Sequence, residues 1–273
     1  MKIVKQLFKF YVNASIHVAL AVFCFVKITV FAFNLPQNVN LNFFIFFGTI
    51  TGYNFVKFSG LVKLYHRSLT ERLRGIQFFS LICFLALLYF GYLLKIETLL
   101  LTIPFTILTV LYAVPFLSGF QRSLRSVGYL KIVLVALVWS GFTVLIPVFD
   151  AKQTIEFSVF LYAIQRFLLV VVLILPFDIR DVKFDAISLQ TIPKKIGVAS
   201  TKRFGIILLI ISLVFEYLIF EDENYNFSFL LLFFLTIVLL MRAKICQPKY
   251  YSSFWVEALP IVWYVILSII NIF

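Results

Sequence analysis

The chain has 273 residues, of which 63% are hydrophobic and only 13% are charged. A soluble domain carries about 25% charged residues, so a fully water-covered surface is excluded and the apolar surplus must face lipid. The net charge is +12, but the basic residues lie between apolar runs, which indicates membrane orientation rather than nucleic-acid binding. The composition therefore predicts an integral membrane protein in contact with membrane lipid and without a nucleic-acid partner.

Nine apolar stretches have about the length that a helix needs to cross a bilayer. In chain order they cover residues 14–33, 41–59, 76–94, 98–117, 129–149, 156–177, 203–220, 226–242 and 255–272. The stretch 41–59 is the weakest, because it carries the polar residues Thr49, Thr51, Asn54 and Lys57. We therefore predict one membrane-embedded domain over residues 1–273, an all-α bundle of about nine transmembrane helices.

The basic residues gather on one side of this predicted topology. With the N-terminus inside, the cytoplasmic segments hold 20 of the 24 Lys and Arg residues, whereas the opposite loops hold six acids and only Lys95 and Lys152. Because basic loops stay cytoplasmic, the asymmetry predicts a multi-pass protein of the plasma (inner) membrane with a cytoplasmic N-terminus. Adding or removing one span would reverse every later loop. Two long cytoplasmic loops then follow the second and sixth spans.

Three aspartates follow the sixth apolar stretch at positions i, i+3 and i+7, namely Asp178, Asp181 and Asp185. A helix turns about 100° per residue, so these carboxylates would share one narrow face and repel each other. A divalent cation removes the repulsion, and Mg²⁺ takes one or two carboxylates together with phosphate oxygens. The spacing favours a Mg²⁺ site for a diphosphate at the membrane surface. The alternative is a solvated acidic face balanced by neighbouring basic residues.

This aspartate run resembles the second aspartate-rich motif of the UbiA superfamily of intramembrane prenyltransferases. Residues 191–197, with Thr-Ile-Pro and a later Gly, are similar to that family's sequence after the motif. Residues 111–115 (Leu-Tyr-Ala-Val-Pro), 128–131 (Gly-Tyr-Leu-Lys) and 136–139 (Ala-Leu-Val-Trp) are similar to its fourth and fifth spans. Nine helices with long cytoplasmic loops after spans two and six also match the family's layout. The resemblance covers most of the chain.

The resemblance implies a helical bundle around a lipid-accessible cavity, in which an isoprenyl diphosphate binds through Mg²⁺ and passes its isoprenyl group to an acceptor. The residues that this implies are Asp178, Asp181 and Asp185 as metal ligands, Arg180, Lys183, Lys57 and Asn54 as diphosphate-binding residues, and Tyr112 in the cavity. The resemblance assigns none of these residues a catalytic role.

The sequence departs from the family at the first aspartate-rich motif, N-D-x-x-D-x-x-x-D, which is expected after the second span. The matching stretch 53–62 retains Asn54, but its three aspartate positions hold Phe55, Phe58 and Val62. Half of the expected metal cage is therefore missing, and Lys57 is a residue that can bind a diphosphate directly as a point charge. The expected function is that of a divergent prenyltransferase.

Two other functions stay open on the sequence alone. One is a catalytically inactive relative that binds lipid or a partner protein through the same cavity, and the other is a small transporter. The transporter hypothesis rests on Arg166, a charge near the middle of the sixth span, where charged residues are costly and usually functional. The structural alternative for Arg166 is an ion pair with Glu216 in the seventh span.

Overall fold

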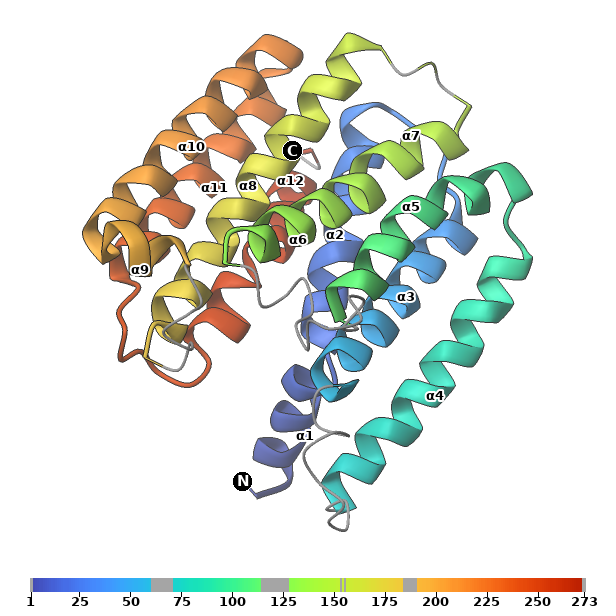
Figure 1. Ribbon diagram of the computed structural model, residues 1–273. Coiled ribbons are helices and arrows are strands. Elements are labelled where there is room, and N and C mark those ends of the chain that lie inside the picture. The colour runs from blue at the N-terminus through green and yellow to red at the C-terminus, as the bar shows by residue number, and fades with distance from the viewer. Residues whose placement is uncertain are drawn as a thin grey trace.

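Inside a bilayer the backbone has no water to bind, so a chain this apolar satisfies its N–H and C=O groups within helices. The computed structural model describes residues 2–59, 71–113, 128–152, 154, 156–183 and 191–271, and these form helices and their connections without a strand (Figure 1). In chain order the helices are α1 (Lys2–Asn13), α2 (Ile16–Ala32), α3 (Val39–Ser59), α4 (Glu71–Tyr92), α5 (Ile96–Ala113), α6 (Leu130–Ser140), η2 (Gly141–Leu145), α7 (Ile146–Asp150), α8 (Phe157–Asp181), α9 (Ile192–Ile196), α10 (Val198–Ile219), α11 (Glu223–Arg242), η3 (Tyr251–Val256) and α12 (Leu259–Ile270).

Seven helical segments in the described part of the chain are long and apolar enough to cross a membrane, and α1 with α2 forms a bent pair that counts as an eighth. Two of the seven are composite, because α6, η2 and α7 run on as Leu130–Asp150, and η3 runs into α12 as Tyr251–Ile270. The helix α3 has the length of a span but is not among the seven segments, because its polar residues lower its mean hydropathy. The all-α, multi-pass membrane bundle is confirmed, whereas the count of nine spans and the N-terminal orientation stay predictions.

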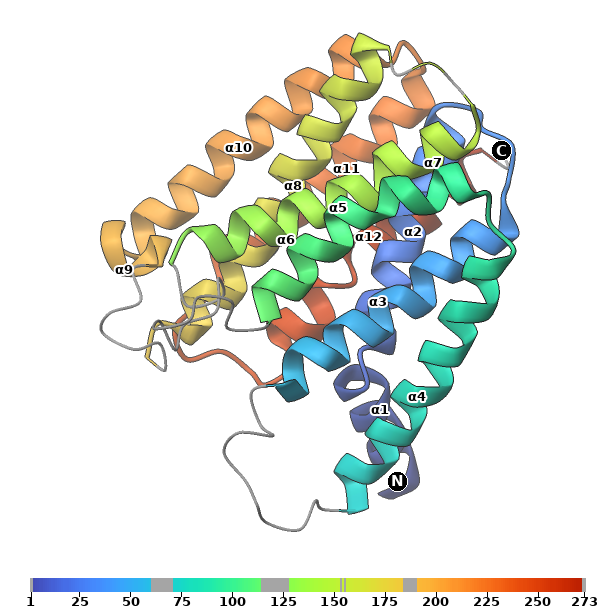
Figure 2. The ribbon, with the colours of Figure 1, turned by 45° about the vertical axis from the view of Figure 1, so that its right-hand side comes forward.

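The helices pack in a closed ring. Neighbours in contact around it are α2 and α3, α3 and α5, α5 and α6, α6 and α8, α8 and α10, α10 and α11, α11 and α12, and α12 and α2. The helices α2 and α8 supply much of the buried core, including Phe25, Ile28, Leu169 and Leu175. The helix α4 stands outside the ring against α3 (Figures 1 and 2), and its Phe78 is 67% exposed, as expected for a side chain that faces lipid.

The bent pair of α1 and α2 has its break at Ser15. This residue has a φ of 64° and a ψ of 19°, in the left-handed region that non-glycine residues rarely adopt, and α1 meets α2 at 57°. The Ser15 hydroxyl donates to Asn54 Oδ1 at 2.8 Å and accepts from Lys57 Nζ at 2.7 Å. Two residues of α3 therefore hold the break in place. The helix α1 lies before the predicted first span and was not expected.

One end of the bundle collects the ends of α3 and α8 and the starts of α6 and η3 (Figures 1 and 2). We call it the basic end, because Lys57, Lys131, Arg180, Lys183 and Lys249 lie on or beside these helix ends. The two regions predicted to carry the motifs thus begin at the same end, as the predicted topology requires. Residues 60–70 and 184–190 themselves lie outside the described residues.

Candidate functional site

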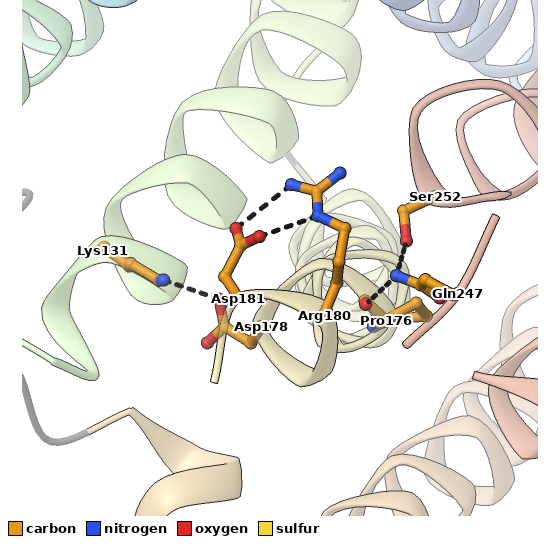
Figure 3. A network of polar contacts seen from close by, with 7 residues as sticks. All are labelled: Lys131, Pro176, Asp178, Arg180, Asp181, Gln247 and Ser252. Carbon is orange, nitrogen blue, oxygen red and sulfur yellow. Dashed lines mark hydrogen bonds and ion pairs between the residues drawn. The ribbon is translucent and has the colours of Figure 1, made fainter. Parts of the chain in front are cut away.

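Asp178 lies near the end of α8 and is buried, with 1% of its surface exposed. Lys131, in the first turn of α6, forms an ion pair with it, and Lys131 Nζ lies 2.7 Å from Asp178 Oδ1 (Figure 3). A charge inside a protein is very costly unless an opposite charge neutralises it. The packing of α6 on α8 thus supplies Asp178 with a cation from the protein itself.

Asp181 is the last residue of α8, and its side chain is 33% exposed. Arg180 Nε and Nη2 donate to Asp181 Oδ1 and Oδ2 at 2.7 and 3.1 Å, which is the strong, two-point form of an arginine–carboxylate contact. Figure 3 shows that Asp178 and Asp181 contact different cations rather than one shared centre. Asp185, the third predicted metal ligand, lies outside the described residues.

The described carboxylates do not fit the predicted metal cage. Within the described residues, no group of three His, Cys, Asp or Glu side chains could hold a metal ion. Asp178 and Asp181 each already contact a cation of the protein. The assignment of Asp178, Asp181 and Asp185 to Mg²⁺ therefore stays a prediction from the sequence, and it depends on Asp185.

Asn54 and Lys57 lie at the basic end, where they bond to the break between α1 and α2. The Asn54 side chain is buried; its amide nitrogen donates to the Ala14 carbonyl at 3.1 Å and to Ser80 Oγ at 2.8 Å. Its oxygen accepts from Ser15, which Lys57 also contacts. These bonds give Asn54 a bracing role between the α1–α2 break, α3 and α4. Contact of Asn54 or Lys57 with a diphosphate stays a prediction.

Glu257 is a charged residue at the basic end that was not among the residues predicted from the sequence. It lies between η3 and α12, is partly buried, and interacts electrostatically with both Lys57 and Arg180. Three segments, α3, α8 and the junction of η3 with α12, thus bring two cations and a carboxylate near one another. A signal was present in the sequence, because an acid inside a predicted span is a candidate functional residue by default.

A hollow of about 620 Å³ lies beside the end of α8, within the size range of ligand sites. Its lining includes Arg180 and Lys183 at the end of α8, Lys249 and Tyr250 before η3, and Asn13 of α1. Among the described residues that line it, none is an aspartate or a glutamate. The structure thus brings together Arg180 and Lys183, two of the four predicted diphosphate-binding residues. It adds Lys249, which was not among the predicted site residues.

Gln247 ties the segment before η3 to α8. Its Nε2 donates to the Pro176 carbonyl oxygen at 3.0 Å and to Ser252 Oγ at 2.8 Å (Figure 3). The segment that carries Lys249 is thereby fixed against the helix that carries Arg180. The fold therefore positions the two segments that bring Arg180 and Lys249 to the hollow.

Tyr112, the predicted cavity residue, lies in the last turn of α5 and is partly buried. It interacts electrostatically with Tyr53 of α3, and the Tyr53 hydroxyl accepts a hydrogen bond from Trp139 Nε1 of α6 at 2.9 Å. Aromatic side chains from three helices thus approach one another at this point of the bundle. The role of Tyr112 in a substrate cavity stays a prediction.

Arg166 is fully buried in α8, and its hydrogen bonds go to Phe25, Thr143 and Tyr162 rather than to Glu216. Its Nη1 donates to the Phe25 carbonyl oxygen at 3.1 Å, its Nη2 bonds to the Tyr162 hydroxyl, and its guanidinium carbon lies 4.1 Å from the centre of the Phe25 ring. Glu216 accepts a hydrogen bond from Gln165 instead. The predicted direct ion pair is replaced by a hydrogen bond from the adjacent Gln165 to Glu216, and Arg166 interacts with Glu216 only electrostatically.

No protein-family model matches the sequence, and no curated protein matches it. The fold is similar to that of a solved structure described as "Structural and mechanistic insights into the biosynthesis of Digeranylgeranylglyceryl phosphate synthase in membranes". The two structures superpose over 100% of this chain and 98% of that chain, with a TM-score of 0.59 and 14% sequence identity. The likeness extends over the whole bundle, so the chain has the fold of a membrane prenyltransferase, as its resemblance to the UbiA superfamily implies.

Proposed function

We propose that this chain is an intramembrane prenyltransferase, which transfers an isoprenyl group from an isoprenyl diphosphate to an acceptor. The observation that carries the proposal is the full-length similarity of its fold to that of a membrane prenyltransferase. The basic end supports it, because Arg180 and Lys183 lie together on one hollow with Lys249. The apolar helices that rise from this end provide the surroundings that an isoprenyl tail needs.

The reaction breaks the bond between the allylic carbon and a diphosphate oxygen, so negative charge grows on the leaving diphosphate. Cations that face this growing charge stabilise the transition state more than the ground state. Arg180 presents a planar guanidinium, and Lys183 and Lys249 add two point charges. The nucleophilic atom of the acceptor forms the new bond to the allylic carbon and gives up its proton.

Asp181 has a positioning role in this proposal. Its carboxylate holds Arg180 through two hydrogen bonds, which fixes the direction of the guanidinium at the end of α8. The guanidinium carries five N–H donors in total, and the contacts with Asp181 use donors on Nε and Nη2 only. Donors remain to contact phosphate oxygens in the hollow.

The test is release of diphosphate by the purified protein in lipid nanodiscs. Geranyl, farnesyl and geranylgeranyl diphosphate are supplied with a panel of phenol and lipid-alcohol acceptors, with and without Mg²⁺. We expect release with at least one pair, and a loss of about 100-fold in the Arg180→Gln variant, the usual effect of removing one group that stabilises a developing anion.

The matched control is Lys95→Gln, an exposed lysine between α4 and α5. This variant is expected to release diphosphate at the rate of the unaltered protein. Absence of release with every donor and acceptor, from protein that is folded, would contradict the proposed transfer.

A further inference from the structure

The hollow beside the end of α8 has a described lining of opposite charge to a carboxylate cage built for metal ions, while Glu257, outside this lining, interacts electrostatically with Arg180. The hollow there is lined by the cations Arg180, Lys183 and Lys249 and, among its described lining residues, by no acid. The neutral residues beside them, Asn13 and Ser253, offer an amide and a hydroxyl, which are hydrogen-bond donors for phosphate oxygens. A site of this composition favours an anion over a cation.

The aspartates near the hollow are already neutralised by protein cations. Asp178 has Lys131 at 2.7 Å, and Asp181 has Arg180 at 2.7 Å. A divalent ion bound to Asp178 would approach the Lys131 ammonium, which costs free energy because like charges repel in a buried setting. For the described residues, a metal ion on either carboxylate would therefore lie close to a cation of the protein.

The helix α3 adds to the same imbalance. In the described part of its last turns it presents Phe55, which is 46% exposed, and Lys57, which bonds to Ser15. A family member with the complete first motif would carry carboxylates there. This chain has Phe55 at the first of those positions and a lysine two residues later, so the described part of α3 offers a metal ion no carboxylate there.

We propose that the hollow binds the phosphate groups of an anionic lipid directly through Arg180, Lys183 and Lys249, without a bridging divalent cation. Identification of that lipid as the isoprenyl diphosphate rests on the function proposed above. An isoprenyl diphosphate and a membrane phospholipid both have a phosphate-bearing head group attached to an apolar tail, so either could occupy this site. Arginine and lysine both bind phosphate oxygens through charge-assisted hydrogen bonds.

The Asp181→Asn variant separates direct binding from metal-mediated binding by the sign of its effect. If Asp181 holds a metal ion that bridges to the phosphates, the substitution weakens binding. If Arg180 contacts the phosphates directly, the substitution removes a negative charge 2.7 Å from the guanidinium and strengthens binding, since the asparagine oxygen still accepts a hydrogen bond that positions Arg180. We expect the dissociation constant to fall, by about threefold or more, because attraction between the basic hollow and the anion increases.

The experiment measures equilibrium binding of farnesyl diphosphate, inorganic diphosphate and phosphatidylglycerol to the full chain in phosphatidylcholine nanodiscs, in EDTA and in Mg²⁺. We expect farnesyl diphosphate to bind in EDTA within about twofold of its affinity in Mg²⁺. The double variant Lys183→Gln/Lys249→Gln is expected to lose at least about tenfold in affinity, while Lys95→Gln is expected to lose none. Binding is also expected to weaken as salt is raised, because exposed charges are screened.

The outcomes distinguish this inference from the proposed function. Farnesyl diphosphate that binds only with Mg²⁺, together with weaker binding by Asp181→Asn, overturns the inference and leaves the transferase proposal standing. Phosphatidylglycerol that binds in EDTA while farnesyl diphosphate does not supports the inference and overturns the transferase proposal. Failure of all three probes to bind overturns both.

Discussion

Replacing Lys131 by methionine is expected to destabilise the folded protein by about 3–5 kcal/mol, the usual cost of removing one partner of a buried ion pair. The reason is the Asp178 carboxylate, which is 1% exposed and has the Lys131 ammonium 2.7 Å away. Without that cation a negative charge stays inside the contact between α6 and α8. Thermal unfolding in detergent, followed by the loss of monodisperse protein, measures the effect.

The double variant Lys131→Met/Asp178→Leu is the control. Removing both charges is expected to restore stability to within about 1 kcal/mol of the unaltered protein, since paired buried charges contribute little net stability. Stability unchanged in Lys131→Met alone would mean that the carboxylate of Asp178 has another means of compensation, such as a bound metal ion. That result would contradict the direct pairing described here.

Replacing Arg166 by leucine is expected to cost about 3 kcal/mol of stability, because hydrogen bonds to a charged donor contribute about 1.5–3 kcal/mol each and their partners stay buried. Arg166 donates to the Phe25 carbonyl of α2, which joins α8 to α2, and to the Tyr162 hydroxyl of α8 itself. Its guanidinium also lies over the Phe25 ring, at 4.1 Å from its centre. The same unfolding measurement reports the loss.

Arg203→Leu provides the matched control, since Arg203 is an exposed arginine on α10. It is expected to change stability by no more than about 0.5 kcal/mol. A transporter that uses Arg166 to carry substrate predicts the opposite pattern, namely a fully stable Arg166→Leu protein that has lost only its flux. That pattern would contradict the anchoring role.

Hydropathy and charge predicted the membrane bundle, but they did not predict where its helices bend. The apolar stretch 41–59 coincides with α3, and 156–177 coincides with most of α8. The break at Ser15 was missed because it depends on side chains of α3, Asn54 and Lys57, that reach across from another helix. No local pattern of residues around Ser15 indicates those contacts.

The candidate site was predicted in part, for a comparable reason. The spacing of Asp178 and Asp181 predicts a Mg²⁺ site, which stays a prediction, and it does not reveal which cations of the protein pair with these two residues. Lys131 belongs to a different helix and meets Asp178 only after α6 packs on α8. Lys249 and Glu257 were missed because their approach to α8 depends on the packing of the last helical segments.

The central claim is that a diphosphate head group binds at the basic end of the bundle, in the hollow beside the end of α8. A structure with a bound analogue tests this claim most directly. The probe is an isoprenyl thiolodiphosphate, which resists breakage of the carbon–sulfur bond. We predict that its phosphate groups lie in the hollow between Arg180, Lys183 and Lys249, with the Lys131–Asp178 ion pair intact. Phosphate groups bound elsewhere, or held by a metal on Asp178 and Asp181 with Lys131 displaced, would contradict the account.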